Sequence, residues 1–384
     1  MTDRTQFHLP TADDCDPARC FVAIELSKKS WLVAVLTSLS EKVSLHTLPA
    51  GNGKELLALL ERARRRSEDG LGRRVEILLC YEAGYDGFWL HRLLEGHDIH
   101  NHVFDPASLL VNRRARRSKT DRIDVQGLLR ALMAHLRGEP KVVSVVRVPS
   151  VEAEDARRLH RERHRLVGER VQHVNRIKGL CALQGIYDYE PLRGDRRERL
   201  AELCTADGRA LPPRLAAEIG RELQRLELVL SMIAELEAER DAIAAEAHPN
   251  AAKIQQLRRL KAIGTEFATV LTNEVFYRRF DNRRQIAAYV GLDASPFRSG
   301  RMNHDQGIAK AGNSKARTTM IELAWIWLRH QPDSILSRWF RDRVRDLRGR
   351  PRRIAIVALA RKLLVALWHY LETGLVPEGA AFKA

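Results

Sequence analysis

Short apolar runs separated by polar turns fill the first third of the chain. The β-branched runs predict five strands, at residues 21–26, 31–37, 43–49, 75–81 and 99–104. Apolar residues at helical spacing predict three helices, at residues 54–66, 87–95 and 121–137. A meander of three strands followed by strands that alternate with helices predicts a mixed sheet with helices on its faces.

From Val151 the pattern changes to long, highly charged helices. One amphipathic segment predicts a helix over residues 152–183, and residues 185–213 interrupt it with a loop-rich stretch. Apolar residues then recur every three or four positions, close to the rhythm of a coiled coil. These positions are Leu215, Ile219, Leu223, Leu226, Leu230 and Ile233. Two long helices joined by a loop predict an antiparallel hairpin or a dimerisation arm.

The last third of the chain is expected to be mainly helical. Residues 260–268 resemble the hairpin between two short helices by which many proteins hold a DNA backbone, since Gly264 permits a tight turn. Residues 291–313 are rich in Gly, Ser, Pro and Asn and predict a functional loop. Two helices, at 315–329 and 352–371, are expected to end the chain, with an Arg-rich stretch between them.

These changes of pattern predict an α/β domain followed by all-α regions. The expected segments are a disordered leader (1–19), a mixed-sheet domain with the element order of ribonuclease-H-like nucleases and transposases (20–148), a helical coiled-coil linker or oligomerisation region (149–252) and a C-terminal helical domain (253–384).

The charge balance favours a polyanionic partner. The formal net charge is +16, with 45% hydrophobic and 30% charged residues. Each Lys or Arg that binds a phosphate releases a condensed counterion, so such an excess favours nucleic acid. An Arg-rich proteome would give the same excess without that function.

Cysteine usage and hydropathy indicate a cytoplasmic protein, associated with the nucleoid if DNA is its partner. The five cysteines form no CxxC pair and are odd in number, which argues against a disulfide framework and a structural zinc. The first twenty residues are polar and do not form a signal peptide. The most apolar stretch, residues 354–371, is interrupted by Arg361 and Lys362, so no membrane span is expected.

Two glutamates end predicted strands of the first domain. Glu25 stands inside an apolar run in the first strand, where an unpaired buried charge costs several kcal/mol. Glu82 ends the fourth strand, at the edge of an open α/β sheet where ligands bind. For Glu25, an edge-strand glutamate that faces water is the plainer alternative.

Two aspartates begin the last predicted helix of the same domain. Asp121 and Asp124 are three residues apart and share one helix face. Acidic residues in a first turn also complement the helix dipole, and this alternative is equally consistent with the pair alone.

Four carboxylates at these positions of one β/α order predict a metal site formed by Glu25, Glu82, Asp121 and Asp124. Oxygen ligands without His or Cys suit Mg²⁺ or Mn²⁺, and such ions support phosphoryl transfer. A basic run around the two aspartates is expected to hold phosphates: Arg113, Arg114, Arg116, Arg117, Lys119 and Arg122.

Five stretches of the chain together resemble the DEDD transposases of insertion sequences, which are relatives of the Piv-type DNA invertases. Three lie in the first domain: residues 23–28 (Ala-Ile-Glu-Leu-Ser-Lys), 81–85 (Tyr-Glu-Ala-Gly-Tyr) and 119–124 (Lys-Thr-Asp-Arg-Ile-Asp). Two lie in the last third: 289–300 (Tyr-Val-Gly-Leu-Asp-Ala-Ser-Pro-Phe-Arg-Ser-Gly) and 308–317 (Ile-Ala-Lys-Ala-Gly-Asn-Ser-Lys-Ala-Arg). The resemblance covers most of the chain, in order and at sensible spacing.

The resemblance implies a recombinase with a RuvC-like N-terminal domain and a C-terminal domain that supplies a serine. It assigns divalent metal to the acidic quartet and makes Ser299 the nucleophile that forms a phosphoserine link with DNA, with Ser295 as the competing candidate. Lys310, Asn313 and Arg317 of the last stretch are then expected to contact nucleic acid. The resemblance also implies a structured guide RNA encoded by the element, and recombination implies a homo-oligomer.

The first acidic position departs from the family pattern, because Glu25 stands where the family has aspartate. The extra methylene matters for Mg²⁺, which demands near-octahedral geometry. Asp293 and Ala294 also replace the usual Thr and Pro. Two alternatives therefore stay open: a junction-resolving nuclease that uses water, and a decayed relative that only binds nucleic acid.

His160 and His164 lie four residues apart on a predicted helix, a spacing that zinc sites use. No third ligand accompanies them. We therefore expect both to be histidines of a charged surface.

Overall fold

The structure, a computed structural model, describes residues 18–109, 120–140, 142–245, 250–299, 302–345 and 347–383. The chain divides into two compact units, and the division falls between Pro149 and Ser150. We call them unit 1 and unit 2 and describe each by itself. The expected leader lies outside the described residues up to residue 17, and Ala18 already belongs to the first strand.

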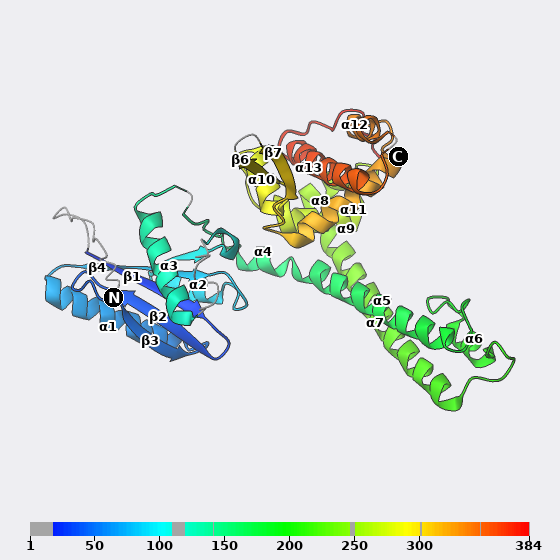
Figure 1. The fold of residues 1–384 in the computed structure, drawn as a ribbon, viewed down its shortest axis with the longest axis horizontal. Helices are drawn as coiled ribbons and strands as arrows, with labels where there is room; N and C mark the ends of the chain where they lie inside the picture. Colours follow the sequence, from blue (N-terminus) through cyan, green and yellow to red (C-terminus); the bar gives the residue numbers. More distant parts are fainter. Residues whose placement is uncertain are drawn as a thin grey trace. The chain divides into compact units, whose positions relative to one another are not determined.

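Unit 1 contains one five-stranded sheet (Figure 1). Its strands are β1 (Ala18–Leu26), β2 (Ser30–Leu36), β3 (Ser44–Pro49), β4 (Val75–Glu82) and β5 (His100–Phe104). Their spatial order is β3-β2-β1-β4-β5. β1 is antiparallel to β2 and parallel to β4, and β5 is parallel to β4. The predicted strands and the mixed sheet are confirmed.

Helices cover both faces of this sheet. They are α1 (Gly53–Leu71), α2 (Trp89–Glu95) and α3 (Asp121–Leu136), with a short 3₁₀ turn, η1 (Pro106–Ser108), after β5. Because side chains alternate along a strand, Val22 of β1 packs with α1 and α2, whereas Ala23 packs with α3. We call the second layer the α3-side core.

Unit 2 begins with a helical hairpin. Its helices are α4 (Val151–Asp155), α5 (Arg158–Ala182), α6 (Arg196–Glu202) and α7 (Pro213–Ala245). α5 and α7 run antiparallel, as three cross-pairs indicate: Arg163 with Glu237, His173 with Glu222, and Arg176 with Glu218. The expected antiparallel hairpin is confirmed, although the helix expected over 152–183 is interrupted at residues 156 and 157.

The rest of unit 2 is a helical bundle. Its elements are α8 (Ala251–Arg258), α9 (Thr265–Leu271), the π-helical turn η3 (Thr272–Phe276), α10 (Arg283–Val290), α11 (Ser314–His330), α12 (Ile335–Val344) and α13 (Arg350–Thr373). Among the described residues α13 alone is long and apolar enough to cross a membrane. Leu359, Leu363 and Leu367 of α13 are completely buried, so its apolar character is explained by its place in the bundle core.

Two expectations for unit 2 were wrong. The loop expected over residues 291–313 contains a β-hairpin of β6 (Ala294–Ser299) and β7 (Met302–Ile308). The polar strand residues and Pro296 concealed this pairing in the sequence. A two-stranded sheet tolerates proline because each strand has an outer edge that needs no hydrogen-bond partner. The Arg-rich stretch before α13 contains α12, whose buried stripe is formed by Phe340 and Val344.

Candidate functional site

Glu25 and Glu82 lie at the carboxyl ends of neighbouring strands, on the face of the sheet that α3 covers. β1 and β4 are parallel and in register one residue before each glutamate. Glu25 is paired with Leu32, and Glu82 with Phe104; both partners pack in the α3-side core. Since paired residues point to one face of a sheet, both half-buried glutamates face the α3 layer.

The loops that follow these two strands also meet. Lys28 Nζ lies 4.8 Å from the centre of the Tyr85 ring. The tyrosine is 86% exposed, so its ring is open to solvent. This edge of the sheet therefore carries a cation and a flat aromatic ring in addition to the two carboxylates. The cation can bind a phosphate of nucleic acid, and the ring can stack on a base.

Asp121 and Asp124 form the first turn of α3. Thr120 caps the helix, and its hydroxyl oxygen accepts a hydrogen bond from the Ile123 N–H at 3.4 Å. Asp124 is half-buried and precedes Val125, which is completely buried in the α3-side core; Asp121 is exposed. The start of α3 therefore carries both aspartates in the layer that covers the two glutamates.

The donor chemistry of these four residues fits Mg²⁺ or Mn²⁺, because all their ligand atoms are carboxylate oxygens. Within the part of the chain that the structure describes, no three His, Cys, Asp or Glu side chains come close enough together to hold an ion. Convergence of the four carboxylates on one metal stays a prediction.

The basic run expected to hold phosphates falls mostly outside the described residues. This is the case for Arg113, Arg114, Arg116, Arg117 and Lys119. Arg122 is described, and it is exposed in the first turn of α3, one residue after Asp121. Its position is consistent with a phosphate contact beside the aspartates.

In unit 2 the two C-terminal motif stretches meet backbone to backbone at the base of the β6–β7 hairpin. Gly291 (φ 71°) ends α10, and a Cβ on it would lie 1.9 Å from the carbonyl oxygen of Ala311. A Cβ on Gly312 (φ 79°) would lie 2.2 Å from the carbonyl oxygen of Tyr289. The Asn313 N–H donates to that same oxygen at 2.8 Å. Only glycine fits both positions, and we call this contact the glycine joint.

Asn313 and Arg317, both expected to contact nucleic acid, hold the glycine joint together. Asn313 Nδ2 donates to a carboxylate oxygen of Glu274 at 2.8 Å. Arg317 Nη1 donates to the carbonyl oxygens of Val290 at 3.1 Å and Ala311 at 3.2 Å. These contacts occupy the Asn313 amide and one guanidinium nitrogen of Arg317.

The hairpin places its two serines at opposite ends of β6. Ser299 pairs with Met302 at the tip; its backbone is described, and its side chain lies outside the described part. Ser295 is half-buried at a β-bulge near the base. Lys310 is exposed, just after β7. The two candidate serines thus lie at different places, Ser299 at the tip of the hairpin and Ser295 near its base.

A groove of about 390 Å³ lies along β6. Three arginines from three elements line it, Arg284 of α10, Arg298 of β6 and Arg361 of α13, and the carboxylate residue Asp293 lines it as well. Guanidinium groups bind phosphate through paired hydrogen bonds. This arrangement can hold a phosphate beside the strand that carries both serines.

A buried carboxylate that the sequence analysis did not single out lies under the glycine joint. Glu274 of η3 is completely buried and accepts hydrogen bonds from His160 Nε2 at 2.8 Å and from Arg161 Nε and Nη2 at 2.7 and 2.9 Å. Asn313 donates to the same carboxylate, and the Tyr289 hydroxyl donates to the Glu274 backbone oxygen at 3.0 Å. We call these five residues the Glu274 network; it connects α5 to both motif stretches.

The network keeps Glu274 ionised. Burial by itself raises the pKa of this carboxyl, but hydrogen bonds from His160, Arg161 and Asn313 and the charge of Arg161 outweigh it. The pKa of Glu274 therefore lies well below its ordinary value. An anion held this way fixes the three donors around it.

One signal in the sequence pointed to this network. Glu274 is the only charged residue in residues 267–276, whose other members are apolar apart from two threonines and one asparagine, and a buried charge in such a stretch needs a partner. The expectation for one of the two histidines was wrong, because His160 is buried against Glu274, whereas His164 is exposed. The partner of His160, Glu274, lies more than 100 residues away in the sequence, so the spacing of residues along α5 could not reveal the pair.

The expected pair of short helices around Gly264 is present as α8 and α9, and Lys261 and Gly264 of the turn between them are exposed. The Lys261 N–H donates to the carbonyl oxygen of Ala381 at 3.0 Å. Lys383 Nζ donates to the carbonyl oxygen of Ile263 at 2.7 Å. The C-terminal segment thus binds the Lys261 N–H and the Ile263 carbonyl oxygen, and a contact of this turn with DNA stays a prediction.

Comparison with known proteins identifies the family that the chain resembles. Residues 254–338 match the model of the transposase IS116/IS110/IS902 family. The chain is 50% identical over 387 residues to "Putative transposase y4rJ" of Sinorhizobium fredii, across 97% of both chains. It is 27% identical to "Transposase for insertion sequence element IS1111A" of Coxiella burnetii, across 78% of both chains.

Proposed function

The chain belongs to the IS116/IS110/IS902 family of insertion-sequence transposases, and we propose that it cuts and rejoins DNA through a covalent bond between Ser299 and a DNA phosphate. The observation that carries this proposal is the glycine joint. The joint holds the start of β6 and the end of β7 against α10 and α11. The strand that ends in Ser299 therefore begins at a position fixed by backbone contacts. The arginine groove along that strand supplies a phosphate-binding surface next to it.

The proposed step exchanges one phosphate ester for another. Ser299 Oγ attacks the phosphorus, and the P–O bond to the neighbouring sugar breaks as the serine ester forms. The serine proton leaves, and the freed sugar oxygen gains a proton. Rejoining is the reverse exchange with another strand end, so no energy source is required. Arg284, Arg298 and Arg361 would stabilise the charge on the phosphate oxygens.

We propose that unit 1 is ribonuclease-H-like and contributes a metal-binding half of the active site. Its strand order and directions support this assignment. Glu25, Glu82, Asp121 and Asp124 would hold Mg²⁺ or Mn²⁺. When bound, such an ion activates a nucleophile and neutralises charge on the leaving oxygen.

The test is the formation of an SDS-resistant protein–DNA species with labelled DNA taken from the ends of the element, in the presence of Mg²⁺. Wild-type protein is expected to form it, and Ser299→Ala to form none, because alanine has no nucleophile. Ser295→Ala is the matched control and is expected to keep the species. Asp124→Asn is expected to reduce it roughly a hundredfold or more, since one charge of the acidic site is lost.

Two outcomes would replace the proposal by an alternative. DNA cleavage that survives Ser299→Ala but not Asp124→Asn would indicate hydrolysis by water at the acidic site. Covalent species formed by Glu25→Asp and not by the wild type would identify a decayed relative. A third outcome would change only the residue: species formed by Ser299→Ala but lost in Ser295→Ala would move the nucleophile to the base of the hairpin.

We also propose that the protein acts as a homo-oligomer together with DNA and a structured guide RNA. The charge of +16 suits two nucleic acids. On the α5–α7 hairpin Val171, Leu228 and Met232 are apolar and exposed, which suits a contact between copies.

Light scattering is expected to give a multiple of the 43.8 kDa chain mass. The double substitution of Leu228 and Met232 by lysine is expected to lower that mass towards a single chain, because it places charges in the proposed contact. A wild-type mass of one chain would contradict the oligomer.

A further inference from the structure

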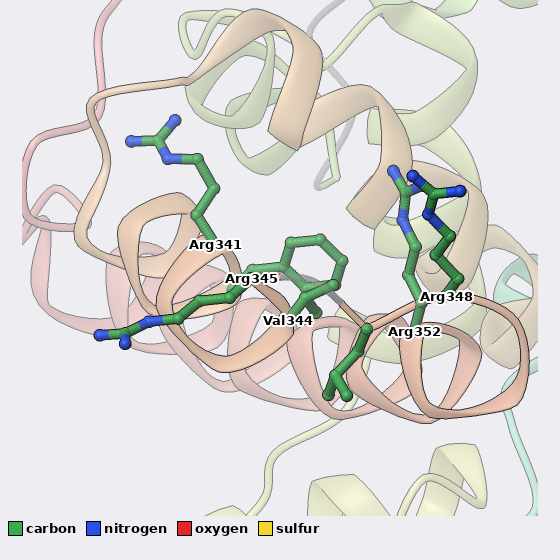
Figure 2. Close-up of a pocket in the computed structure, with 7 residues that line it drawn as sticks. Arg341, Val344, Arg345, Arg348 and Arg352 are labelled. Atoms are coloured by element: carbon green, nitrogen blue, oxygen red, sulfur yellow. The ribbon is translucent and has the colours of Figure 1, made fainter.

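We propose that unit 2 contains a second nucleic-acid site, separate from the hairpin groove, which binds the phosphodiester backbone of a single strand. The site is a cavity of about 510 Å³ between α12 and the start of α13 (Figure 2). Four arginines line it: Arg341, Arg345, Arg348 and Arg352. The inference rests on the proposed function and adds a surface that the covalent step does not use.

The cavity has an apolar floor and a cationic rim. Phe340 and Val344 are buried beneath it, and Leu347 is partly exposed at its edge. The arginine side chains extend outward from this floor, with Arg348 and Arg352 projecting in the same direction (Figure 2). A volume in this range accepts a group the size of a nucleotide.

The rim charges have no carboxylate partner within the described part of unit 2. Other arginines of the unit are paired, as Arg163 is with Glu237 and Arg240 with Glu266. Four like charges around one cavity repel one another, and an anion between them removes that repulsion. Guanidinium binds phosphate oxygens bidentately, which makes a phosphodiester a fitting ligand.

An exposed aromatic ring beside the cavity favours a single strand over a duplex. The Arg352 guanidinium lies 5.5 Å from the centre of the Trp325 ring, whose centre is 6.3 Å from that of Phe340 in an edge-on arrangement. Trp325 is 39% exposed, so part of its ring is open to solvent. An unpaired base can stack there while the rim holds its phosphates, whereas the bases of a duplex are already stacked.

The backbone of Arg345, the residue that ends α12 and lines the cavity, is strained. Arg345 has φ 29° and ψ −101°, a conformation that residues other than glycine seldom adopt. Its N–H is fixed by the Arg341 carbonyl oxygen at 2.8 Å. Such strain persists where the surroundings impose it and is frequent at binding sites.

The cavity is not an extension of the hairpin groove. Arg352 of the cavity and Arg361 of the groove are nine residues apart on α13, which is about two and a half turns. They therefore project from opposite sides of the helix. A change in the cavity should weaken binding and leave the covalent step with bound DNA intact.

The test compares Arg348→Gln/Arg352→Gln with wild type in the full-length protein. The matched control is Arg214→Gln/Arg221→Gln, which removes two exposed charges from α7. Binding of single-stranded RNA, single-stranded DNA and duplex DNA of equal length is measured by fluorescence anisotropy across a salt series. The cavity variant is expected to bind single strands roughly tenfold more weakly, with a salt slope lower by about 1.4, from about 0.7 for each phosphate contact.

The three nucleic acids in the experiment distinguish which kind of strand supplies the phosphates that the cavity binds. A loss for RNA alone, for DNA alone or for both single strands supports the site and identifies its ligand. A loss confined to the duplex, an unchanged slope, or an equal loss in the control variant would overturn it. Thermal unfolding at an unchanged temperature shows that the variant is folded.

A second measurement needs no variant. Bound single strand is expected to protect Arg348 and Arg352, but not Arg214, from an arginine-modifying reagent, as read by mass spectrometry. Equal modification with and without the strand would also overturn the site. Protein that binds single strands through the cavity yet forms no covalent species would instead contradict the proposed function alone.

Discussion

Replacing Glu274 with glutamine is expected to lower the free energy of unfolding by about 3 kcal/mol at pH 7. Removing one partner of a buried ion pair typically costs about 3–5 kcal/mol. The lower end applies here because the Arg161 side chain is 54% exposed and can return to water. Glutamine also brings an N–H₂ group against donors of His160, Arg161 and Asn313, so at least one buried hydrogen bond is lost. Urea denaturation at pH 7 measures the difference.

The pH dependence of this difference has a definite sign. In the folded protein the pKa of Glu274 is depressed, so the unfolded chain binds the proton more readily. The stabilisation is fully present above the unfolded pKa of about 4.3 and is lost as pH falls below it. The difference in unfolding free energy between wild type and Glu274→Gln should be constant from about pH 5 to 7 and should decrease towards pH 3.

Glu169→Gln is the matched control for this prediction. Glu169 pairs with Arg165 on the same helix, and that arginine is 82% exposed. An exposed pair contributes about 0–1 kcal/mol, so this variant should unfold almost as the wild type does. Equal destabilisation by the two substitutions, or a gap for Glu274→Gln that grows as pH falls, would mean that the Glu274 network is not a buried ion pair.

The sheet and the positions of its carboxylates could be predicted from local pattern. Residues 20–24 of β1 form a short, continuous apolar run between polar residues, which is typical of a strand covered on both faces. Glu25 and Glu82 were placed correctly at strand ends because each follows such an apolar run. Which face they share followed only from the pairing with neighbouring strands.

The parts that were missed depend on contacts distant in sequence or on patterns hidden by charge. Phe340 and Val344 form the buried stripe of α12, but the arginines around them conceal its helical period. The β6–β7 hairpin has polar strands, and the backbone contacts of the glycine joint at its base join residues that are about 20 apart in the sequence. His160 and Glu274 are 114 residues apart, so no local pattern could pair them.

The Glu274 network and the glycine joint act on the same two motif stretches. Asn313 donates its side-chain amide to Glu274 and its backbone N–H to Tyr289, and it also caps α11. Asn313, which the resemblance leads us to expect at nucleic acid, therefore also has a structural task in this chain. Separating the two tasks requires substitutions that disturb the joint without removing a charge.

Gly291→Ala is such a substitution, and it is expected to destabilise the protein by about 2–5 kcal/mol and to reduce the covalent DNA species more than tenfold. A non-glycine residue in a left-handed conformation costs about 1–2 kcal/mol. The new Cβ would lie 1.9 Å from the Ala311 carbonyl oxygen, so the backbone of one stretch must move, which costs about 1–3 kcal/mol more. That movement shifts the base of β6, and with it Ser299.

Two glycines of the same unit separate strain from overlap. Gly374 has φ 76°, and a Cβ on it would have no atom within 4 Å, so Gly374→Ala should show the cost of the left-handed conformation alone. Gly220, inside α7, also has open space and an ordinary φ, so Gly220→Ala should be neutral or stabilise by up to about 1 kcal/mol. Urea denaturation ranks the three variants. If Gly291→Ala unfolds like Gly374→Ala and keeps its activity, the two stretches do not depend on close contact, and the fixed base proposed for the hairpin is wrong.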